Sequence, residues 1–161
     1  MTNAWMKWMG AAVAAAALAV AGCGDDHGEH DADEELCTHL KGGESRAVTA
    51  TAEDTGAPEI GSDHTRYEIS LPEANGQRAG RVTFVVDHGG EFIFGLSRDV
   101  PMQLLPAAGG ETPATTKASS EACSELAVKH TVDLTVGTYV VRFGPTSEQT
   151  VNVVVEHESH E

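Results

Sequence analysis

The stretch GRVTFVVDHGGEFIFGL, residues 80–96, decides the fold class of this chain. Apolar side chains recur at every second position on both sides of a central turn signal, at Val82, Phe84 and Val86, and at Phe92, Phe94 and Leu96. A period of two is typical of a strand with one buried face, because successive side chains of a strand point to opposite faces of a sheet. The turn signal DHGG at residues 87–90 predicts a hairpin between the two strands.

The same alternation recurs toward the end of the chain and, more weakly, before residue 80. It covers residues 132–136, 139–143 and 151–155, separated by turn signals at residues 136–138 and 144–147, with weaker strands expected at 46–52 and 66–71. About seven to nine short strands at this spacing favour an all-β fold, an antiparallel β-sandwich of the jelly-roll or Ig-like kind, over a small barrel. Residues 106–120, rich in Pro, Ala, Gly, Thr and Ser, are expected to form an exposed loop.

Two motifs in this half of the chain carry a family resemblance. GEFIFGL at residues 90–96 and VGTYVVRF at residues 136–143 resemble the aromatic strand and the Gly-Thr-Tyr strand of prepeptidase C-terminal domains. The resemblance covers residues 80–155 and implies a jelly-roll sandwich. Since one fold serves many functions, the resemblance predicts no activity.

The N-terminal 23 residues have the pattern of an export signal. Lys7 is followed by small apolar residues at 11–21, a run too short to cross a bilayer, and then by VAGC at residues 20–23. This ending resembles the lipobox of bacterial lipoproteins. The resemblance implies a signal peptide at residues 1–22, lipidation of Cys23 and anchoring in the cell envelope, and Gly24 points to the outer membrane, facing the periplasm or the cell surface.

The residues after Cys23 predict a flexible tether. Residues 24–35 are rich in carboxylates and contain no large apolar side chain, so they cannot form a core. We therefore expect a disordered acidic tether at 23–35, a β-sandwich domain at 36–156 and a His/Glu tail at 157–161. The formal net charge of −15 argues against nucleic acid as a partner, because phosphate binding needs clustered basic residues.

Two cysteines remain if Cys23 carries lipid. In an oxidising compartment, Cys37 and Cys123 are expected to form a disulfide. The alternative is a pair of metal-binding or redox-active thiols, although no Cys-x-x-Cys spacing is present.

The histidines are the residues most suggestive of a function. His27 and His30, and His157 and His160, form two matched pairs among carboxylates near the two ends of the chain. Imidazole and carboxylate ligands suit zinc or copper, so these four predict a weak, exchangeable metal site. The alternative is that they lie in polar tails without a partner. The weaker candidate ligands are His39, His64, His88 and His130.

These features favour a protein that is not an enzyme. The sequence contains neither a Gly-x-Ser-x-Gly elbow nor a His-Glu-x-x-His helix, two common catalytic motifs. We expect a lipid-anchored envelope protein that binds or buffers zinc or copper, with an envelope protein as its partner. The alternative is a structural or protein- or glycan-binding lipoprotein without a metal role, which predicts an exposed apolar patch. An enzyme would need a deep pocket lined by His64, His88 or His130.

Overall fold

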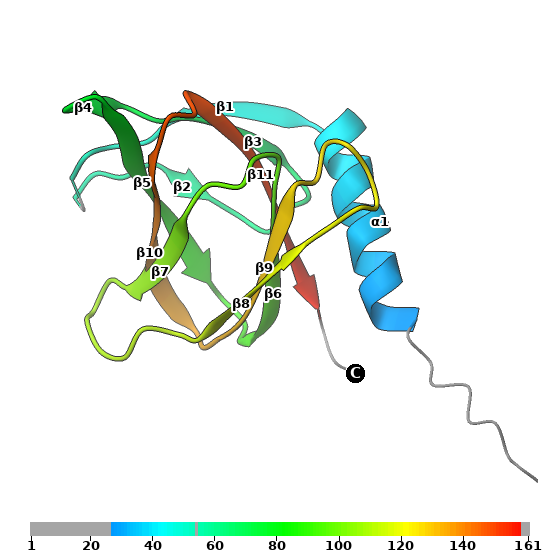
Figure 1. Cartoon of the computed structure of the whole chain (residues 1–161). Helices are drawn as coiled ribbons and strands as arrows, with labels where there is room; N and C mark the ends of the chain where they lie inside the picture. The colour runs from blue at the N-terminus through cyan, green and yellow to red at the C-terminus, as the bar shows by residue number, and fades with distance from the viewer. Residues whose placement is uncertain (1–26, 54, 159–161) are drawn as a thin grey trace, which may run out of the picture.

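The computed structural model describes residues 27–53 and 55–158 and confirms the predicted all-β sandwich. Two β-sheets face each other, and one helix, α1 (His27–Gly42), lies against the outer face of the larger sheet (Figure 1). The eleven strands are β1 (Ser45–Thr49), β2 (Glu59–Ile60), β3 (Arg66–Ser70), β4 (Glu73–Ala74), β5 (Gln77–Val86), β6 (Gly90–Leu96), β7 (Met102–Pro106), β8 (Thr115–Ser119), β9 (Val128–Leu134), β10 (Gly137–Thr146) and β11 (Thr150–Glu158).

The two sheets are mixed rather than purely antiparallel. The six-stranded sheet has the order β1-β3-β11-β6-β9-β8, and the five-stranded sheet contains β2-β5-β10-β7 with β4 paired to β5. Most neighbours are antiparallel, but β1 pairs with β3 and β2 pairs with β5 in parallel. One strand intervenes in the sequence between β1 and β3, and two intervene between β2 and β5, which leaves enough chain for a crossover.

The predicted hairpin at residues 87–90 is wrong, because β5 and β6 lie in different sheets. The turn signals at 136–138 and 144–147 likewise precede a change of sheet, from β9 to β10 and from β10 to β11. Each of these strands has one apolar face that must be buried. When the chain crosses to the opposite sheet, the apolar faces of consecutive strands point into the same interior. The turns therefore occur where the sequence predicts them, but the strands on either side of each turn do not pair with each other.

The interior between the sheets is built from the alternating side chains identified in the sequence. Phe84 of β5 contacts Phe92 and Phe94 of β6 edge to face, with ring centroids 5.3 and 5.2 Å apart. All three rings are buried. The fold class is therefore set by the period-two pattern, because it supplies the two inner faces that pack together.

The expectation of a flexible tether is corrected over residues 27–35, which belong to helix α1. Ala32, Leu36 and Leu40 recur four residues apart and are buried against Ile93, Leu126 and Val154. Burial of each leucine contributes about 1.5–3 kcal/mol, so a few apolar side chains hold an otherwise acidic helix on the sheet. The folded domain thus begins before Leu36. Among the described residues, no helix is long and apolar enough to span a membrane.

A strand also interrupts the expected loop at residues 106–120. Strand β8 pairs with β9 at the edge of the six-stranded sheet, and four of its five residues are exposed. Its sequence has no apolar alternation because neither face is buried, and this explains why the pattern did not predict it.

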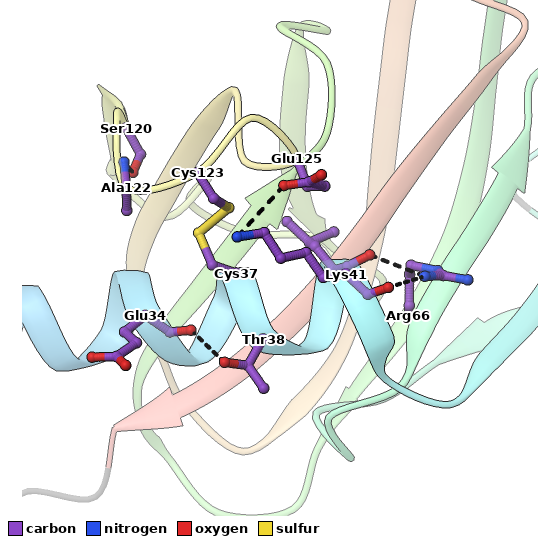
Figure 2. A network of polar contacts seen from close by, with 10 residues as sticks. Glu34, Cys37, Thr38, Lys41, Arg66, Ser120, Ala122, Cys123 and Glu125 are labelled. Carbon is purple, nitrogen blue, oxygen red and sulfur yellow. Dashed lines mark hydrogen bonds and ion pairs between the residues drawn. A yellow bond between two sulfur atoms is a disulfide. The ribbon is translucent and has the colours of Figure 1, made fainter.

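The predicted disulfide between Cys37 and Cys123 is confirmed. It joins α1 to the irregular segment between β8 and β9 (Figure 2). The two cysteines are 86 positions apart, and closing a loop of this length is expected to stabilise the fold by roughly 4.5 kcal/mol.

Candidate metal centre

Four side chains from three parts of the fold converge beside the C-terminal half of α1. They are Glu35 and His39 of α1, His64 of the loop before β3, and Glu156 of β11. One nitrogen or carboxylate oxygen from each residue lies within 4.8 Å of the others. This cluster is the candidate metal centre of the protein.

The helix places two of these side chains together. Residues four apart are neighbours on a helix surface, so Glu35 and His39 project in nearly the same direction. The distance from His39 Nε2 to Glu35 Oε1 is 3.9 Å. Both lie beside the buried row formed by Leu36 and Leu40, which fixes how the helix sits on the sheet.

Strand β11 supplies the buried member of the cluster. Glu156 follows Val154 by two residues, so both side chains point to the face of the sheet that α1 covers. Its cross-strand neighbour Ile93 packs, like Val154, against Leu36 and Leu40 in the apolar layer between α1 and the sheet. Only 5% of Glu156 is exposed, which is unusual for a carboxylate.

The pairing of β3 with β11 brings His64 to Glu156. The ladder ends with Val153 opposite Tyr67, and continuing the same register by three residues places His64 opposite Glu156. The loop is fixed by the buried Tyr67 hydroxyl, which donates to Asp63 Oδ1 and accepts from Gly61 N–H, each at 2.9 Å. His64 itself has a φ of 59°, a left-handed conformation that non-glycine residues adopt infrequently.

The closest contact in the cluster joins His64 to Glu156. The Nδ1–H of His64 donates to Glu156 Oε2 at 2.7 Å, and the same nitrogen lies 3.6 Å from Glu35 Oε1. His39 Nε2 lies 4.0 Å from Glu156 Oε1, and the two imidazole centroids are 4.9 Å apart. Each histidine is thus placed between two carboxylates.

Burial raises the pKa of Glu156 to about 7, and the nearby carboxylate of Glu35 adds to this effect while His64 opposes it. The Oε1 atom of Glu156 is buried and has no hydrogen-bond partner among the described residues. A buried polar atom without a partner lowers stability, and such groups with a displaced pKa are concentrated at functional sites. Glu156 therefore points to a ligand that completes its interactions.

The spacing of the four side chains fits a tetrahedral ion after small movements. Zinc binds imidazole and carboxylate at about 2.0–2.2 Å, so neighbouring ligand atoms lie roughly 3.4 Å apart around it. The four ligand contacts range from 2.7 to 4.0 Å. Because ligand atoms of the cluster lie up to 4.8 Å apart, an ion would replace the shared proton between His64 and Glu156 and draw the more distant atoms together by up to roughly 1.4 Å.

The cluster contains two of the weaker histidine candidates, His39 and His64. The favoured His157 lies on β11 rather than in a tail. His157 projects to the opposite face from Glu156 and stacks on Phe92, with ring centroids 4.4 Å apart. The side chains of His27 and His30, and the whole of His160, lie outside the described residues.

The two remaining histidine candidates, His88 and His130, lie outside the cluster. His88 is exposed in the turn between β5 and β6, and His130 is buried in β9. The three histidines considered for an enzyme, His64, His88 and His130, thus occupy a loop, a turn and a strand interior. The large apolar side chains that the described part of the chain leaves exposed are Val85 and Val136.

Two members of the cluster, Glu35 and Glu156, were not singled out from the sequence. Glu35 precedes His39 by four residues, but the pairing of these residues depends on a helix where a tether was expected. Glu156 precedes His157 in an acidic stretch, and its role depends on the register of β3 and β11. The only available signal was therefore the Glu-x-x-x-His spacing at residues 35–39.

Burial of His130 predicts an acid-sensitive contribution to stability. Burial lowers its pKa, and Lys117 adds to this effect. The unfolded chain therefore takes up a proton below about pH 6.5 that the folded protein resists, so the free energy of unfolding falls as pH falls through this range. In urea unfolding, we expect the free energy of unfolding of His130→Leu, measured relative to that of the wild type, to be higher at pH 5 than at pH 8. An equal difference at both pH values would contradict this origin.

The chain was compared with known proteins at the level of families and of single sequences. No protein-family model matches it. No curated protein matches it significantly. The resemblances to lipoproteins and to prepeptidase C-terminal domains therefore stay predictions, and functional inference rests on the cluster itself.

Proposed function

We propose that this protein is a lipid-anchored, non-enzymatic protein of the cell envelope that binds a divalent metal ion at Glu35, His39, His64 and Glu156. The observation that carries the proposal is the buried, unpartnered Oε1 of Glu156, directed into a cluster with two imidazoles. This set of two nitrogens and two oxygens suits zinc or copper(II). It lacks the sulfur ligands that copper(I) prefers, and its imidazoles disfavour magnesium and calcium.

The exposure of the cluster supports reversible binding. The side chains of Glu35 and His64 are 51% and 53% exposed, whereas that of Glu156 is 6% exposed. One side of the site is therefore open to solvent, and an ion can enter or be passed to another protein from that side. Structural zinc sites are usually closed, so this arrangement favours buffering or delivery of the metal over a purely structural role.

Lipidation at Cys23 would hold the cluster close to the membrane. Whatever conformation residues 24–26 adopt, four peptide steps from Cys23 to the start of α1 span at most about 14 Å. Glu35 follows after eight residues, and the helix rises about 12 Å over that distance. The metal would then be presented within roughly 30 Å of the bilayer, within reach of a partner embedded in the membrane.

Calorimetric titration of the full-length chain in detergent with zinc tests the proposal. We expect one zinc ion to bind with micromolar or tighter affinity, because the four ligand groups are already gathered by the fold. The His64→Ala variant should lose at least tenfold in affinity, whereas His88→Ala, which changes an exposed histidine outside the cluster, should bind as the wild type does.

A second titration with copper(II) determines the preferred ion. Binding no tighter than millimolar for both ions would exclude the proposed function. Equal losses in His64→Ala and His88→Ala would show that the cluster is not the binding site.

A further inference from the structure

We infer that the Cys37–Cys123 disulfide controls the metal site, so that reduction of the disulfide by a dithiol lowers metal affinity. The inference rests on the proposed function, because it concerns the same four ligands. It follows from the position of Cys37 on α1, the contacts that hold the helix, and an open groove beside the disulfide.

Helix α1 is held on two opposite flanks. Cys37 lies two residues from both Glu35 and His39, and two residues of a helix correspond to a rotation of about 200°. The disulfide is therefore attached to the flank of α1 opposite Glu35 and His39. The buried row of Leu36 and Leu40 lies between the two flanks. Any shift of the helix on the disulfide flank changes the position of half the ligand set.

Besides the disulfide, polar contacts join that flank of α1 to the segment between β8 and β9 (Figure 2). Asp33 accepts a hydrogen bond from Ser120 at 2.8 Å and pairs with Lys129 at 3.0 Å. Lys41 and Glu125 form a partly exposed ion pair at 3.8 Å. The exposed Lys41–Glu125 pair contributes little, whereas Asp33 and Lys129 are largely buried. The disulfide is the covalent constraint on this side of the helix, and it is the one that reduction removes.

The segment that carries Cys123 has little regular structure to hold it in place. It lies between the end of β8 and the start of β9, and its internal backbone hydrogen bond joins Leu126 N–H to the Cys123 carbonyl at a long 3.4 Å. Leu126 packs in the apolar layer between α1 and the sheet. Release of Cys123 would therefore loosen both the segment and its packing on α1.

A groove beside the disulfide offers access to a small reductant. It has a volume of about 500 Å³ and is lined by Glu34, Cys37, Thr38, Lys41 and Ala122. Cys37 is buried, whereas Cys123 is half-buried and is the more open of the two sulfur-bearing residues. One thiolate of a dithiol bonds to one cysteine sulfur and displaces the other as a thiolate. Its second thiolate then displaces the remaining cysteine, which leaves a cyclic disulfide of the reductant and, after protonation, two cysteine thiols.

Reduction is expected to weaken metal binding without unfolding the sandwich. Because α1 carries Glu35 and His39, a displacement of the helix moves these two groups away from His64 and Glu156 and weakens binding that needs all four. The β-sheets have their own core of buried side chains and do not depend on the helix for it. The helix also keeps a contact on the metal side, where Arg66 Nη1 donates to the Leu40 carbonyl at 3.0 Å.

The experiment measures zinc affinity of the full-length chain in detergent before and after reduction, by competition with a fluorescent zinc chelator. A phosphine reductant that binds zinc weakly is used for the affinity measurement. We expect at least a tenfold loss of affinity with an unchanged circular dichroism signal from the sheets. The Cys37→Ser/Cys123→Ser variant should have the affinity of the reduced wild type and should not respond to the reductant.

A parallel measurement follows the appearance of thiols when the folded protein is treated with dithiothreitol in native buffer. The inference is overturned if these thiols do not appear, if reduced and oxidised proteins bind zinc equally, or if affinity is lost only together with the sheet signal. Failure of the oxidised wild type to bind zinc would instead exclude the proposed function, so the two failures are distinguishable.

Discussion

The Glu156→Gln variant is expected to lose metal affinity by about two orders of magnitude, because loss of a ligand exceeds the roughly 10- to 100-fold cost of changing an outer contact. Glutamine has nearly the same shape and can still accept the hydrogen bond from His64 Nδ1, but it is a poor metal ligand. Glu158→Gln is the matched control, since Glu158 lies two residues further along β11 and outside the cluster. Zinc titration of both variants at neutral pH provides the comparison.

The same substitution is expected to stabilise the metal-free protein at alkaline pH. The pKa of Glu156 is raised from 4.5 to about 7 in the fold, so the folded protein holds a proton that the unfolded chain releases. The free energy of unfolding of the wild type therefore falls as pH rises from about 4.5 to 7 and then stays level. Each unit of pKa displacement corresponds to at most 1.36 kcal/mol, which predicts a gain of about 1–3 kcal/mol for Glu156→Gln at pH 8.

Metal should offset this difference in stability, and it should reverse the order wherever the variant's advantage is smaller than the contribution of bound zinc. Zinc at about 100 times its dissociation constant adds roughly 2.7 kcal/mol to the wild type and little to the variant. Urea unfolding at pH 4 and pH 8, with and without zinc, measures all these differences. A wild type more stable than Glu156→Gln at pH 8 without metal would contradict the interpretation of Glu156 as a ligand that the fold leaves unsatisfied.

The Gly95→Val variant is expected to displace α1 from the sheet. A Cβ at Gly95 would lie 2.8 Å from Leu36 Cδ2 and 3.1 Å from Leu126 Cδ1, so the helix approaches closely only because no side chain is present. Overpacking of this kind costs about 1–3 kcal/mol. Because α1 carries Glu35 and His39, zinc affinity should fall as well, by about tenfold for each 1.4 kcal/mol of lost binding energy.

The comparison for this variant is Gly42→Val, at the end of α1, where an added Cβ meets nothing within 4 Å. Urea unfolding and zinc titration are measured for both variants. Reduced stability of Gly95→Val with unchanged zinc affinity would show that the position of the helix does not determine the metal site.

The strands that form the two inner faces were predictable because each one carries its own burial pattern. Phe84 and Phe94 alternate with outward-facing residues wherever the chain runs in the final fold, so the local sequence is sufficient to identify β5 and β6. The disulfide was predictable for a similar reason, since only Cys37 and Cys123 remain to pair once Cys23 is assigned to lipid. The pairing of the strands was not predictable, because a turn marks a reversal and not the sheet that the chain enters.

Helix α1 was not predicted because only a narrow stripe of apolar residues on its surface is buried. Leu36 and Leu40 lie among acidic residues, and the favourable burial comes from Ile93 and Val154, which are distant in the sequence. The composition of the cluster could not be predicted for the same reason. His157 resembles a ligand by composition, yet the alternation of β11 turns it toward Phe92 and turns Glu156 toward α1.

By itself, the sequence predicted a β-sandwich, because the alternation of apolar residues is a local rule that identifies strands. It also predicted the disulfide, because two of the three cysteines remain once Cys23 is assigned to lipid. The tertiary structure decided which strands pair and which histidines meet. His64 and Glu156 are 92 positions apart and become neighbours only through the register of β3 and β11, while Glu35 and His39 join them only because α1 packs on that sheet. This proximity depends on packing between residues far apart in the sequence, which a local sequence pattern cannot predict.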